Sequence, residues 1–416
     1  MGMRVAIVGA GISGLVVAYL LAPQHEVVVF EANDYPGGHT NTIAVSWQGQ
    51  TYPVDTGFIV FNERNYPNFT RLLRRLGVAW QPSDMSFSFR CQATGMEYGF
   101  RSLNALLADR RNLLRPAFYQ LLWDLGRFRR DLPRLVQLAD DQLTVGQYLA
   151  SQGYSQAFRR FFLIPFAAAI WSAAPNRLAD FPILYLARFF ANHGLLNLRD
   201  KPRWQVIRGG SSQYLPPLMA RFREQVRLSC PVQEIRRQQE GVTITLPGGD
   251  QEHFDAVVLA VHSDQALRLL ADASPQEQAI LGAIPYQENQ VVLHTDSSWL
   301  PRRRAAWSSW NYVLPKQEGG GVAITYHQNR LQSLSASVEF CVTLNPPDPI
   351  PADAILRQIT YHHPVYTAAG FAAQKQWSEI NGVRHTYFCG AYWGYGFHED
   401  GVNSALAVGR LFGVSL

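Results

Sequence analysis

The chain has 416 residues, of which 47% are hydrophobic and 17% are charged, and its formal net charge is +5 at pH 7. This composition excludes an intrinsically disordered protein, and the 32 glycines and 24 prolines are too few for a collagen-like or low-complexity chain. The four cysteines lie far apart without a CxxC pair, so we expect neither a disulfide framework nor a metal site. We expect a globular enzyme of two or three domains, at roughly 150 residues a domain, without a nucleic-acid partner.

The N-terminal segment predicts a strand, a glycine turn, a helix and a second strand. Residues 5–22 form an uncharged run after Arg4, which resembles a membrane span in length. Within it, however, Val5–Val8 is rich in β-branched residues and Gly9–Gly14 contains three glycines, and Glu26–Glu31 then has a buried-strand pattern. A membrane helix would not need glycines at fixed positions, so we expect no signal peptide and no span. We expect a cytoplasmic protein, with a peripheral contact at the inner membrane face left open.

The glycine turn has the GxGxxG spacing of a dinucleotide-binding loop. Gly9 permits the tight turn, Gly11 lets the backbone approach a pyrophosphate, and Gly14 lets the helix pack close to the strand. The helix N-terminus presents N–H groups to the phosphates, and Glu31 is placed to bind the ribose hydroxyls. The predicted dinucleotide contacts of this unit are Gly9, Gly11, Ile12, Ser13, Gly14, Glu31 and Ala32.

Later segments favour FAD over NAD. The run Pro36-Gly37-Gly38-His39 brings a second glycine pair beside the diphosphate and resembles the extended fingerprint of two-dinucleotide-domain flavoproteins. In those flavoproteins the residue at the Val232 position offers its backbone to adenine. Tyr387–Ala391 predicts a strand that ends at Gly390, and a helix that begins at Gly401-Val402 directs its positive end toward the flavin pyrimidine.

The chain as a whole resembles the superfamily of flavin amine oxidases, protoporphyrinogen oxidases and phytoene desaturases. A closer similarity is to predicted NAD/FAD-binding proteins that resemble the N-terminal flavin domain of plant cyclopropane fatty acid synthases. The segments that carry the resemblance are GGHTNT (37–42), VDTGFIVFNERNYPNF (54–69), AIWS (169–172), FFANHGLL (189–196), GGSSQYL (209–215), HTDSSWLPRRRAAWSSWNY (294–312) and GAYWGYGFHEDGVNSA (390–405). The resemblance implies an FAD enzyme whose neighbours act on membrane lipid acyl chains. It also places the turn Asp55-Thr56-Gly57-Phe58 beside the isoalloxazine ring.

Two departures from the family pattern bear on function. His39 stands where the family usually has Arg or Lys, so we expect its pairing with phosphate to be weaker at neutral pH. Many amine oxidases keep a lysine near flavin N5, on the strand after an Ile-Pro pair. Here Ile284-Pro285 is followed by residues 286–292 without a lysine, and Asn289 and Gln290 are the neutral alternatives for holding a water. Oxidation of a simple amine is therefore less expected than dehydrogenation of a carbon chain.

Two insertions separate the FAD segments. Residues 71–199 have a helical period with interleaved arginines, which fits either a solvated face or a surface that docks on anionic lipid headgroups. Residues 282–379 predict strands at Gln290–Thr295, Gly321–Tyr326 and Val338–Leu344 and a helix after Pro351. The cluster of Trp299, Trp307, Trp310 and Tyr312 fits either a core or the apolar lining for an acyl chain.

The catalytic candidates lie near the C-terminus and in the helical insertion. His398 is the first choice, because it precedes Gly401 and a histidine there takes up a proton near pH 7. Packing by hydrogen bonds is the alternative reading of His398. Trp393 and Tyr395 are candidates to wall the substrate, and His193 is a weaker candidate for proton relay. We do not expect covalent flavin attachment through Cys389.

These observations predict an α/β fold with two domains, a Rossmann-like FAD domain and an inserted mixed α+β substrate domain. The predicted FAD domain comprises residues 1–70, 200–281 and 380–416, and the substrate domain comprises residues 71–199 and 282–379. The expected reaction is dehydrogenation of an apolar, lipid-like substrate by hydride transfer to flavin N5, with O2 or a quinone as reoxidant. The alternatives are a redox-neutral flavin isomerase, an amine oxidase and a non-catalytic flavin-binding partner of a lipid methyltransferase.

Overall fold

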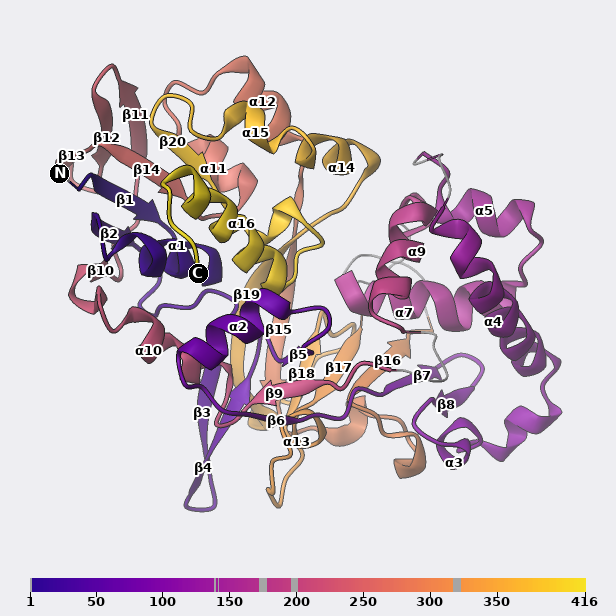
Figure 1. The fold of residues 1–416 in the computed structure, drawn as a ribbon. Helices are drawn as coiled ribbons and strands as arrows, with labels where there is room; N and C mark the ends of the chain where they lie inside the picture. Colours follow the sequence, from indigo (N-terminus) through magenta and orange to yellow (C-terminus); the bar gives the residue numbers. More distant parts are fainter. Residues whose placement is uncertain (1, 138–139, 141, 172–177, 196–200, 317–322) are drawn as a thin grey trace.

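The first half of the architecture is a five-stranded parallel sheet (Figure 1). The computed structural model describes residues 2–137, 140, 142–171, 178–195, 201–316 and 323–416. The sheet has the order β10-β2-β1-β14-β20, and every neighbouring pair is parallel. Its strands are β10 (Val226–Arg227), β2 (Glu26–Phe30), β1 (Arg4–Val8), β14 (Ala256–Leu259) and β20 (Thr386–Phe388).

The five-stranded sheet is buried on both faces, which explains the continuous apolar runs in its strands. Along β1, Val5 and Ile7 pack into one hydrophobic core and Ala6 and Val8 pack into another. This alternation is the period of two that an extended strand imposes. The helices α1 (Ile12–Leu21) and α16 (His398–Leu411) pack against each other on the first of these two faces.

The second half is a seven-stranded sheet with the order β19-β15-β18-β17-β16-β7-β8. Its strands are β19 (Ile355–Pro364), β15 (Tyr286–His294), β18 (Cys341–Leu344), β17 (Ile324–His327), β16 (Trp310–Leu314), β7 (Phe87–Cys91) and β8 (Glu97–Gly99). All neighbours are antiparallel except β16 and β7, which are parallel. The strands predicted at Gln290–Thr295 and Val338–Leu344 are present with shifted ends. Of the strand predicted at Gly321–Tyr326, residues 321 and 322 lie outside the described residues.

The helix predicted after Pro351 is wrong. Only the single turn Ala352–Ala354 is helical there, and the chain then continues as β19. Ile355, Ile359 and Thr360 are β-branched, and β19 pairs along its whole length with β15. Pairing with β15 therefore sets the extended conformation of this segment.

Helices cover one side of the seven-stranded sheet, on the right of Figure 1. They are α3 (Leu103–Leu106), α4 (Pro116–Leu135), α5 (Val145–Ser151), α6 (Gln156–Phe158), α7 (Ile164–Trp171) and α9 (Ile183–Asn192). Their apolar faces share one hydrophobic core with the sheet. The prediction of a largely helical segment 71–199 missed β6 (Trp80–Pro82), β7 and β8, because these strands are short and find their partners far along the chain.

The remaining elements are short. Three strands, β5 (Val60–Phe61), β9 (Gln205–Ile207) and β6, form a small sheet, and β3 (Thr42–Trp47) and β4 (Gln50–Asp55) form a hairpin. A three-stranded antiparallel unit comprises β11 (Glu234–Gln238), β12 (Gly241–Thr245) and β13 (Gln251–Phe254). The other helices are α2 (Pro67–Arg75), α10 (Leu215–Met219), α11 (Ser263–Leu269), α12 (Pro275–Gly282), α13 (Gln328–Leu331), α14 (Ala368–Gln374) and α15 (Trp377–Ile380).

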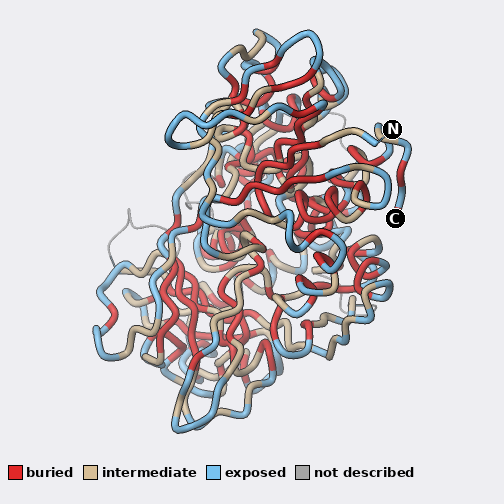
Figure 2. Tube along the Cα trace, turned by 90° about the vertical axis from the view of Figure 1, so that its left-hand side faces the viewer, coloured by how far each residue is buried: buried red, intermediate tan, exposed pale blue. Residues whose placement is uncertain are grey.

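The predicted α/β fold is confirmed, and Figure 2 shows the buried residues concentrated along the two large sheets. The strands of the five-stranded sheet all come from residues 1–70, 200–281 and 380–416. The strands of the seven-stranded sheet all come from residues 71–199 and 282–379. This pattern supports the domain boundaries, which stay a prediction. Among the described residues, no helix combines the length and the apolar character needed to cross a bilayer.

Candidate functional site

A continuous cavity of about 1700 Å³ runs between the two large sheets. Ligand pockets usually measure roughly 300–1000 Å³, so this volume admits a dinucleotide together with a second molecule. We call the part of the cavity beside the glycine turn, where Asn33, Pro231 and Arg268 are exposed, its first end. We call the part where Arg101, Arg129, Lys201 and Arg203 are exposed its second end.

The glycine turn at the first end is shaped by close backbone contacts. Gly9 has a φ of +103°, and a Cβ on Gly14 would lie 2.0 Å from the carbonyl oxygen of Gly9. Gly14 therefore allows the close approach of α1 to β1 that the sequence predicts. Gly11 differs, because a Cβ there would meet no atom within 4 Å and would enter the cavity. No side chain caps the N-terminus of α1, so its first N–H groups remain available to an anion.

Glu31 lies where the ribose-binding acid is expected, just beyond the end of β2. Its Oε2 accepts a hydrogen bond from the N–H of Ala10 at 2.8 Å, and its Oε1 accepts one from the N–H of Asn33 at 2.9 Å. The carboxylate is nearly buried and lines the cavity beside Ala32. These two bonds fix its orientation against the glycine turn.

The second glycine pair lies directly on the first turn. The N–H of Gly37 donates to the carbonyl of Ala10 at 2.8 Å, and the Cβ position of Gly38 lies 3.3 Å from Gly11 Cα. Both glycines have positive φ values, 119° and 58°. Gly57 is equally constrained, because a Cβ there would lie 2.1 Å from the carbonyl oxygen of His39. The structure thus brings three separate glycine segments to one wall of the cavity.

Most of the predicted site residues line this cavity, and four do not. Those that line it are Gly9, Gly11, Ile12, Ser13, Glu31, Ala32, Gly37, Gly38, His39, Thr56, Gly57, Phe58, His193, Val232, Gly390 and His398. Gly14, Trp393, Gly401 and Val402 are not among the lining residues. Val402 is fully buried in the core, and Trp393 packs against Tyr392 with ring centroids 5.0 Å apart. Trp393 is therefore not placed to wall a substrate.

The start of the last helix is three residues earlier than predicted. The helix α16 begins at His398, and the N–H of Gly401 already donates to the carbonyl of Phe397 at 3.1 Å. Asp400 explains the shift, because its carboxylate accepts hydrogen bonds from the N–H groups of Tyr395 and Phe397. A Cβ on Gly401 would lie 2.8 Å from Ile12 Cγ2, so this glycine permits close packing of α16 on α1.

His398 is a packed, hydrogen-bonded residue. Its Nε2 lies 3.0 Å from both Thr40 Oγ1 and Tyr214 Oη, and its ring stacks on Phe58 with centroids 3.6 Å apart. Burial lowers the pKa of His398 to about 3. A histidine with so low a pKa is a weak base at neutral pH, which argues against His398 as the base; that role stays a prediction. The alternative interpretation, a hydrogen-bonded packing residue, fits the geometry.

His193 has a similar character. Its Nδ1 lies 3.0 Å from the carbonyl oxygen of Phe189, and its ring stacks on the Phe189 ring at 4.0 Å. Burial lowers the pKa of His193 to about 4, although the ring lines the cavity. This pKa argues against a proton relay at neutral pH.

The sequence analysis missed a histidine cluster on the cavity wall. His262, His362 and His363 line the cavity next to His39, whose ring stacks on Tyr361 at 4.6 Å and lies 5.2 Å from the ring of His363. Burial lowers the pKa of His363 to about 3 and that of His39 to about 4. The adjacent pair His362-His363 was the available signal, but the region was read as helical. Among the described residues, no group of His, Cys, Asp or Glu has the geometry to hold a metal ion.

Asn289, one of the two neutral residues expected in place of the family lysine, has well-defined hydrogen-bond partners. Asn289 is fully buried on β15, and its Nδ2 lies 2.9 Å from His363 Nδ1. Its Oδ1 accepts hydrogen bonds from Asn345 at 2.7 Å and from Gln287 at 3.1 Å. Because these protein groups engage Asn289 fully, it positions the imidazole of His363.

The second end of the cavity is apolar inside and basic at its opening. Its apolar lining includes Phe87, Phe100, Leu122, Leu125, Phe162, Phe166, Ile170, Trp171, Phe189, Leu195, Trp310 and Tyr326. Of the described lining residues only Glu31 and Asp84 are carboxylates. Asp84 is bound by Ser309 Oγ at 2.7 Å, by Ser86 Oγ and by Arg330 at 3.4 Å. Trp310 lines the cavity, whereas Trp299 packs in a hydrophobic core. Each of the two alternatives for the tryptophan cluster therefore holds for one of these residues.

Comparison with known families identifies the group to which this protein is related. The model of the family of flavin-containing amine oxidoreductases matches residues 12–323. The chain belongs to this family. A relative from Mycobacterium tuberculosis, AofH, carries the name of a flavin-containing monoamine oxidase. It is 26% identical over 323 residues, which are 73% of this chain and 65% of the relative. The match thus spans less than two thirds of that relative's length.

Several solved structures share the fold of this chain. Putrescine oxidase bound to putrescine superposes with a TM-score of 0.71 at 15% identity, covering 99% of both chains. Cyclohexylamine oxidase from Brevibacterium oxydans gives 0.70 at 20% identity, covering 99% of this chain and 100% of that one. A fatty acid isomerase from P. acnes gives 0.70 at 18% identity, covering 99% of both chains. At these identities the likeness shows the fold.

Membership of the flavin-containing amine oxidoreductases confirms the predicted superfamily, the FAD cofactor and the class of oxidoreductases. The residues present fit FAD. The open space over Gly11 lies at the uncapped N-terminus of α1, and His39 Nε2 is buried without a hydrogen-bond partner among the described residues. The similarity to plant cyclopropane synthases and the methyltransferase partner stay predictions. Burial strongly raises the pKa of the Cys389 thiol, which agrees with a flavin held without a covalent bond to it.

Proposed function

We propose that this flavoenzyme dehydrogenates an apolar, lipid-like substrate, such as a fatty acyl chain with an anionic head. The observation that carries the proposal is the second end of the cavity, where an apolar interior meets an opening with four cationic side chains, Arg101, Arg129, Lys201 and Arg203. Arginine and lysine at such an opening suit a carboxylate or phosphate head.

The carboxylates argue against a simple amine as the substrate. An ammonium group buried in this cavity needs an anionic or hydrogen-bonding partner, since an unpaired charge is costly in an apolar site. Asp84 is already paired with Arg330 and two serines, and Glu31 belongs to the other end. The described lining therefore offers an ammonium no free carboxylate in the apolar part.

We further propose which residues of the chain bind the cofactor. The backbone N–H groups of Ile12 and Ser13 bind the diphosphate, Glu31 binds the ribose, and Val232 lies beside the adenine. The turn Thr56-Gly57-Phe58 and Gly390 lie beside the isoalloxazine ring. FAD held by these residues would supply a hydride acceptor for the substrate carbon, with O2 or a quinone as the reoxidant, and the proton lost from the adjacent carbon would pass to solvent. The role of the chain is to hold the reacting carbon about 3–3.5 Å from the acceptor and to exclude water.

The proposal is tested by mixing the purified holoenzyme anaerobically with a free fatty acid, a phospholipid, a carotenoid and a primary amine, and recording the flavin absorbance. Bleaching by one of the lipids is the expected result. Bleaching by the amine alone overturns the lipid assignment. A lipid product that forms only after chemical reduction of the flavin, with no net electron transfer, overturns dehydrogenation in favour of isomerisation.

A pair of variants on α4 makes the test specific. Leu125→Asp introduces a charge into the apolar lining, whereas Gln120→Asp introduces the same charge on an exposed position of the same helix. We expect Leu125→Asp to abolish bleaching by lipid while FAD remains bound, and Gln120→Asp to leave bleaching unchanged. Equal bleaching rates in both variants would show that the reaction does not use this part of the cavity.

A further inference from the structure

One surface of the molecule exposes large apolar side chains in an unusual concentration. We name it the α3–α4 surface, defined by Leu103, Leu113, Leu114, Tyr119 and Trp123. These are five of the eight exposed large hydrophobic residues among the described residues. Leu114 is 86% exposed, Leu103 78% and Trp123 71%, so these side chains do not contribute to the core. Such a cluster marks an interaction site rather than scattered surface residues.

The charges around this surface are of one sign. Residues 101–134 contain eight arginines and three aspartates, so this segment alone carries a formal charge of +5, equal to that of the whole chain. Of the arginines, Arg101, Arg129, Arg130 and Arg134 are exposed and form no ion pair within the described part of the chain. The aspartates point inward, where Asp109 and Asp124 are buried and Asp131 accepts hydrogen bonds from Tyr148 and Tyr154.

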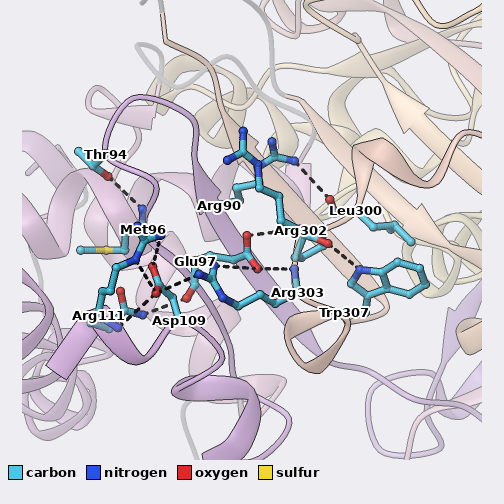
Figure 3. A network of polar contacts seen from close by, with 12 residues as sticks. Arg90, Thr94, Met96, Glu97, Asp109, Arg111, Leu300, Arg302, Arg303 and Trp307 are labelled. Atoms are coloured by element: carbon cyan, nitrogen blue, oxygen red, sulfur yellow. Dashed lines mark hydrogen bonds and ion pairs between the residues drawn. The ribbon is translucent and has the colours of Figure 1, made fainter.

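A buried acidic network anchors the surface to the seven-stranded sheet (Figure 3). Asp109 forms ion pairs with Arg111 at 3.0 Å and Arg303 at 3.2 Å. Glu97 on β8 accepts hydrogen bonds from the backbone N–H groups of Arg302 and Arg303 at 3.1 and 2.8 Å. The buried carboxylates of Asp109 and Glu97 thus hold the residues that precede α4 against the seven-stranded sheet. The negative charge of this region is held inside, and the apolar and basic side chains are left on the outer face.

The helix α4 joins this surface to the cavity. At 3.6 residues a turn, Tyr119, Trp123, Arg130 and Arg134 share one face of the helix. The adjoining face carries Leu122, Leu125, Gly126 and Arg129, all of which line the cavity. Figure 1 places α3 and α4 at the edge of the molecule opposite β1 and α1. The surface therefore borders the basic opening and lies far from the dinucleotide end.

We propose that the α3–α4 surface docks on an anionic lipid bilayer. Leucine, tyrosine and tryptophan side chains enter the region between headgroups and acyl chains, and the arginines bind the anionic headgroups. Docking places the basic opening of the cavity against the bilayer, so that an acyl chain passes into the apolar lining without crossing water. The inference deepens the proposed function, because it names the source of the substrate.

The test is sedimentation of the holoenzyme with vesicles. The two vesicle types are phosphatidylcholine alone and an equal mixture of phosphatidylglycerol and phosphatidylcholine. We expect strong binding to the mixed vesicles that weakens as salt is added. Each basic residue near an anionic surface strengthens binding roughly fivefold, so Arg130→Gln with Arg134→Gln should lower the partition coefficient roughly 25-fold. Leu114→Ser with Trp123→Ser should abolish the binding that persists at high salt.

Matched control variants lie elsewhere on the surface. Arg221→Gln with Arg223→Gln removes two exposed arginines, and Leu411→Ser removes an apolar side chain that is 49% exposed. These controls should bind vesicles as the wild type does. Equal binding of the α3–α4 variants and the controls overturns the proposal. So does an absence of preference for phosphatidylglycerol, or a dimer that the α3–α4 variants dissociate while vesicle binding persists.

The failure of this inference is distinguishable from failure of the proposed function. Bleaching is measured with monomeric fatty acid in the absence of vesicles, and the α3–α4 variants should keep that reaction because none of their substituted residues lines the cavity. Vesicle binding without bleaching by any lipid overturns the function and leaves the docking surface intact. Bleaching without vesicle binding overturns the docking surface alone.

Discussion

The contrast between Gly11 and Gly14 gives a sharp test of the cofactor site. The two glycines are three residues apart in one loop, but a Cβ on Gly11 would enter the cavity, whereas a Cβ on Gly14 would lie 2.0 Å from the oxygen of Gly9. We expect Gly11→Ala to keep the apoprotein folded, at a cost of about 1 kcal/mol or less for the changed N-cap. We expect Gly14→Ala to destabilise the apoprotein itself, by about 1–3 kcal/mol or more, because backbone atoms must move.

The effect of Gly11→Ala on FAD follows from the same space. If the methyl group occupies volume that the diphosphate needs, overpacking costs about 1–3 kcal/mol, which is roughly 10- to 100-fold in the Kd of FAD. At a FAD concentration 100-fold above the wild-type Kd, the cofactor stabilises the wild type by about 2.7 kcal/mol. A variant with 100-fold weaker binding would keep only about 0.4 kcal/mol of that stabilisation.

The assay is chemical unfolding of each apoprotein with and without added FAD, together with the flavin content of the purified protein. The expected pattern is a normal apoprotein with a lost FAD response for Gly11→Ala, and a weakened apoprotein for Gly14→Ala. A Gly11→Ala variant that binds FAD as tightly as the wild type would refute the location of the diphosphate. The conclusion does not depend on activity, so it is independent of the substrate.

Three further predictions concern buried charged and titratable groups. Arg237, whose side chain is buried, pairs with Glu277 at 2.7 Å and with Asp272 at 2.6 Å. Arg237→Met should therefore lower the free energy of unfolding by about 3–5 kcal/mol, measured by denaturant titration, because Glu277 is left buried and unpaired. Burial raises the pKa of Asp55 from 3.8 to about 6. The folded state thus binds this proton more tightly than the unfolded chain, so the contribution of Asp55 is present below about pH 4 and falls by about 3 kcal/mol as the pH rises through 6. Asp55→Asn should remove that slope from a series of unfolding curves at different pH values, and an unchanged slope would contradict the assignment. His398→Gln should change kcat by less than about tenfold. It should also leave the pH profile of kcat unchanged around pH 6.5, because His398 is neutral and packed. A profile that loses a group titrating at about pH 6.5 would support His398 as the base.

The local parts of the fold were predictable from the sequence, because their signals lie close together in the chain. The turn at Gly9–Gly14 and the strands β1 and β2 can be predicted from a glycine pattern and two β-rich runs. The family resemblance added the distant residues Val232 and Gly390, which both line the cavity. The β19 strand was missed since its conformation depends on pairing with β15, more than sixty residues earlier. The start of α16 was misplaced because a carboxylate cap at Asp400 outweighed the glycine signal.

Beyond the adjacent pair His362-His363, the meeting of the histidines could not be deduced from the sequence, for the same reason. His39, His262 and His363 come from three segments that meet only when the two large sheets face each other. Histidine identity alone does not show burial, and burial is what lowers the pKa values and makes His398 a packing residue. The sequence therefore indicated the glycine segments that line the cavity, but not the burial that lowers the pKa values of the histidines around them.

The close contact of Gly401 with Ile12 and the pairing of β14 with β20 have a consequence for biosynthesis. The first forty residues carry nearly the whole diphosphate-binding motif, but the core beneath α1 is closed only by a helix that ends five residues before the C-terminus. During translation the glycine loop emerges long before β20 and α16, so the apolar side of α1 stays uncovered until these elements have been synthesised. A chain truncated before residue 386 would leave that side of α1 exposed to aggregation.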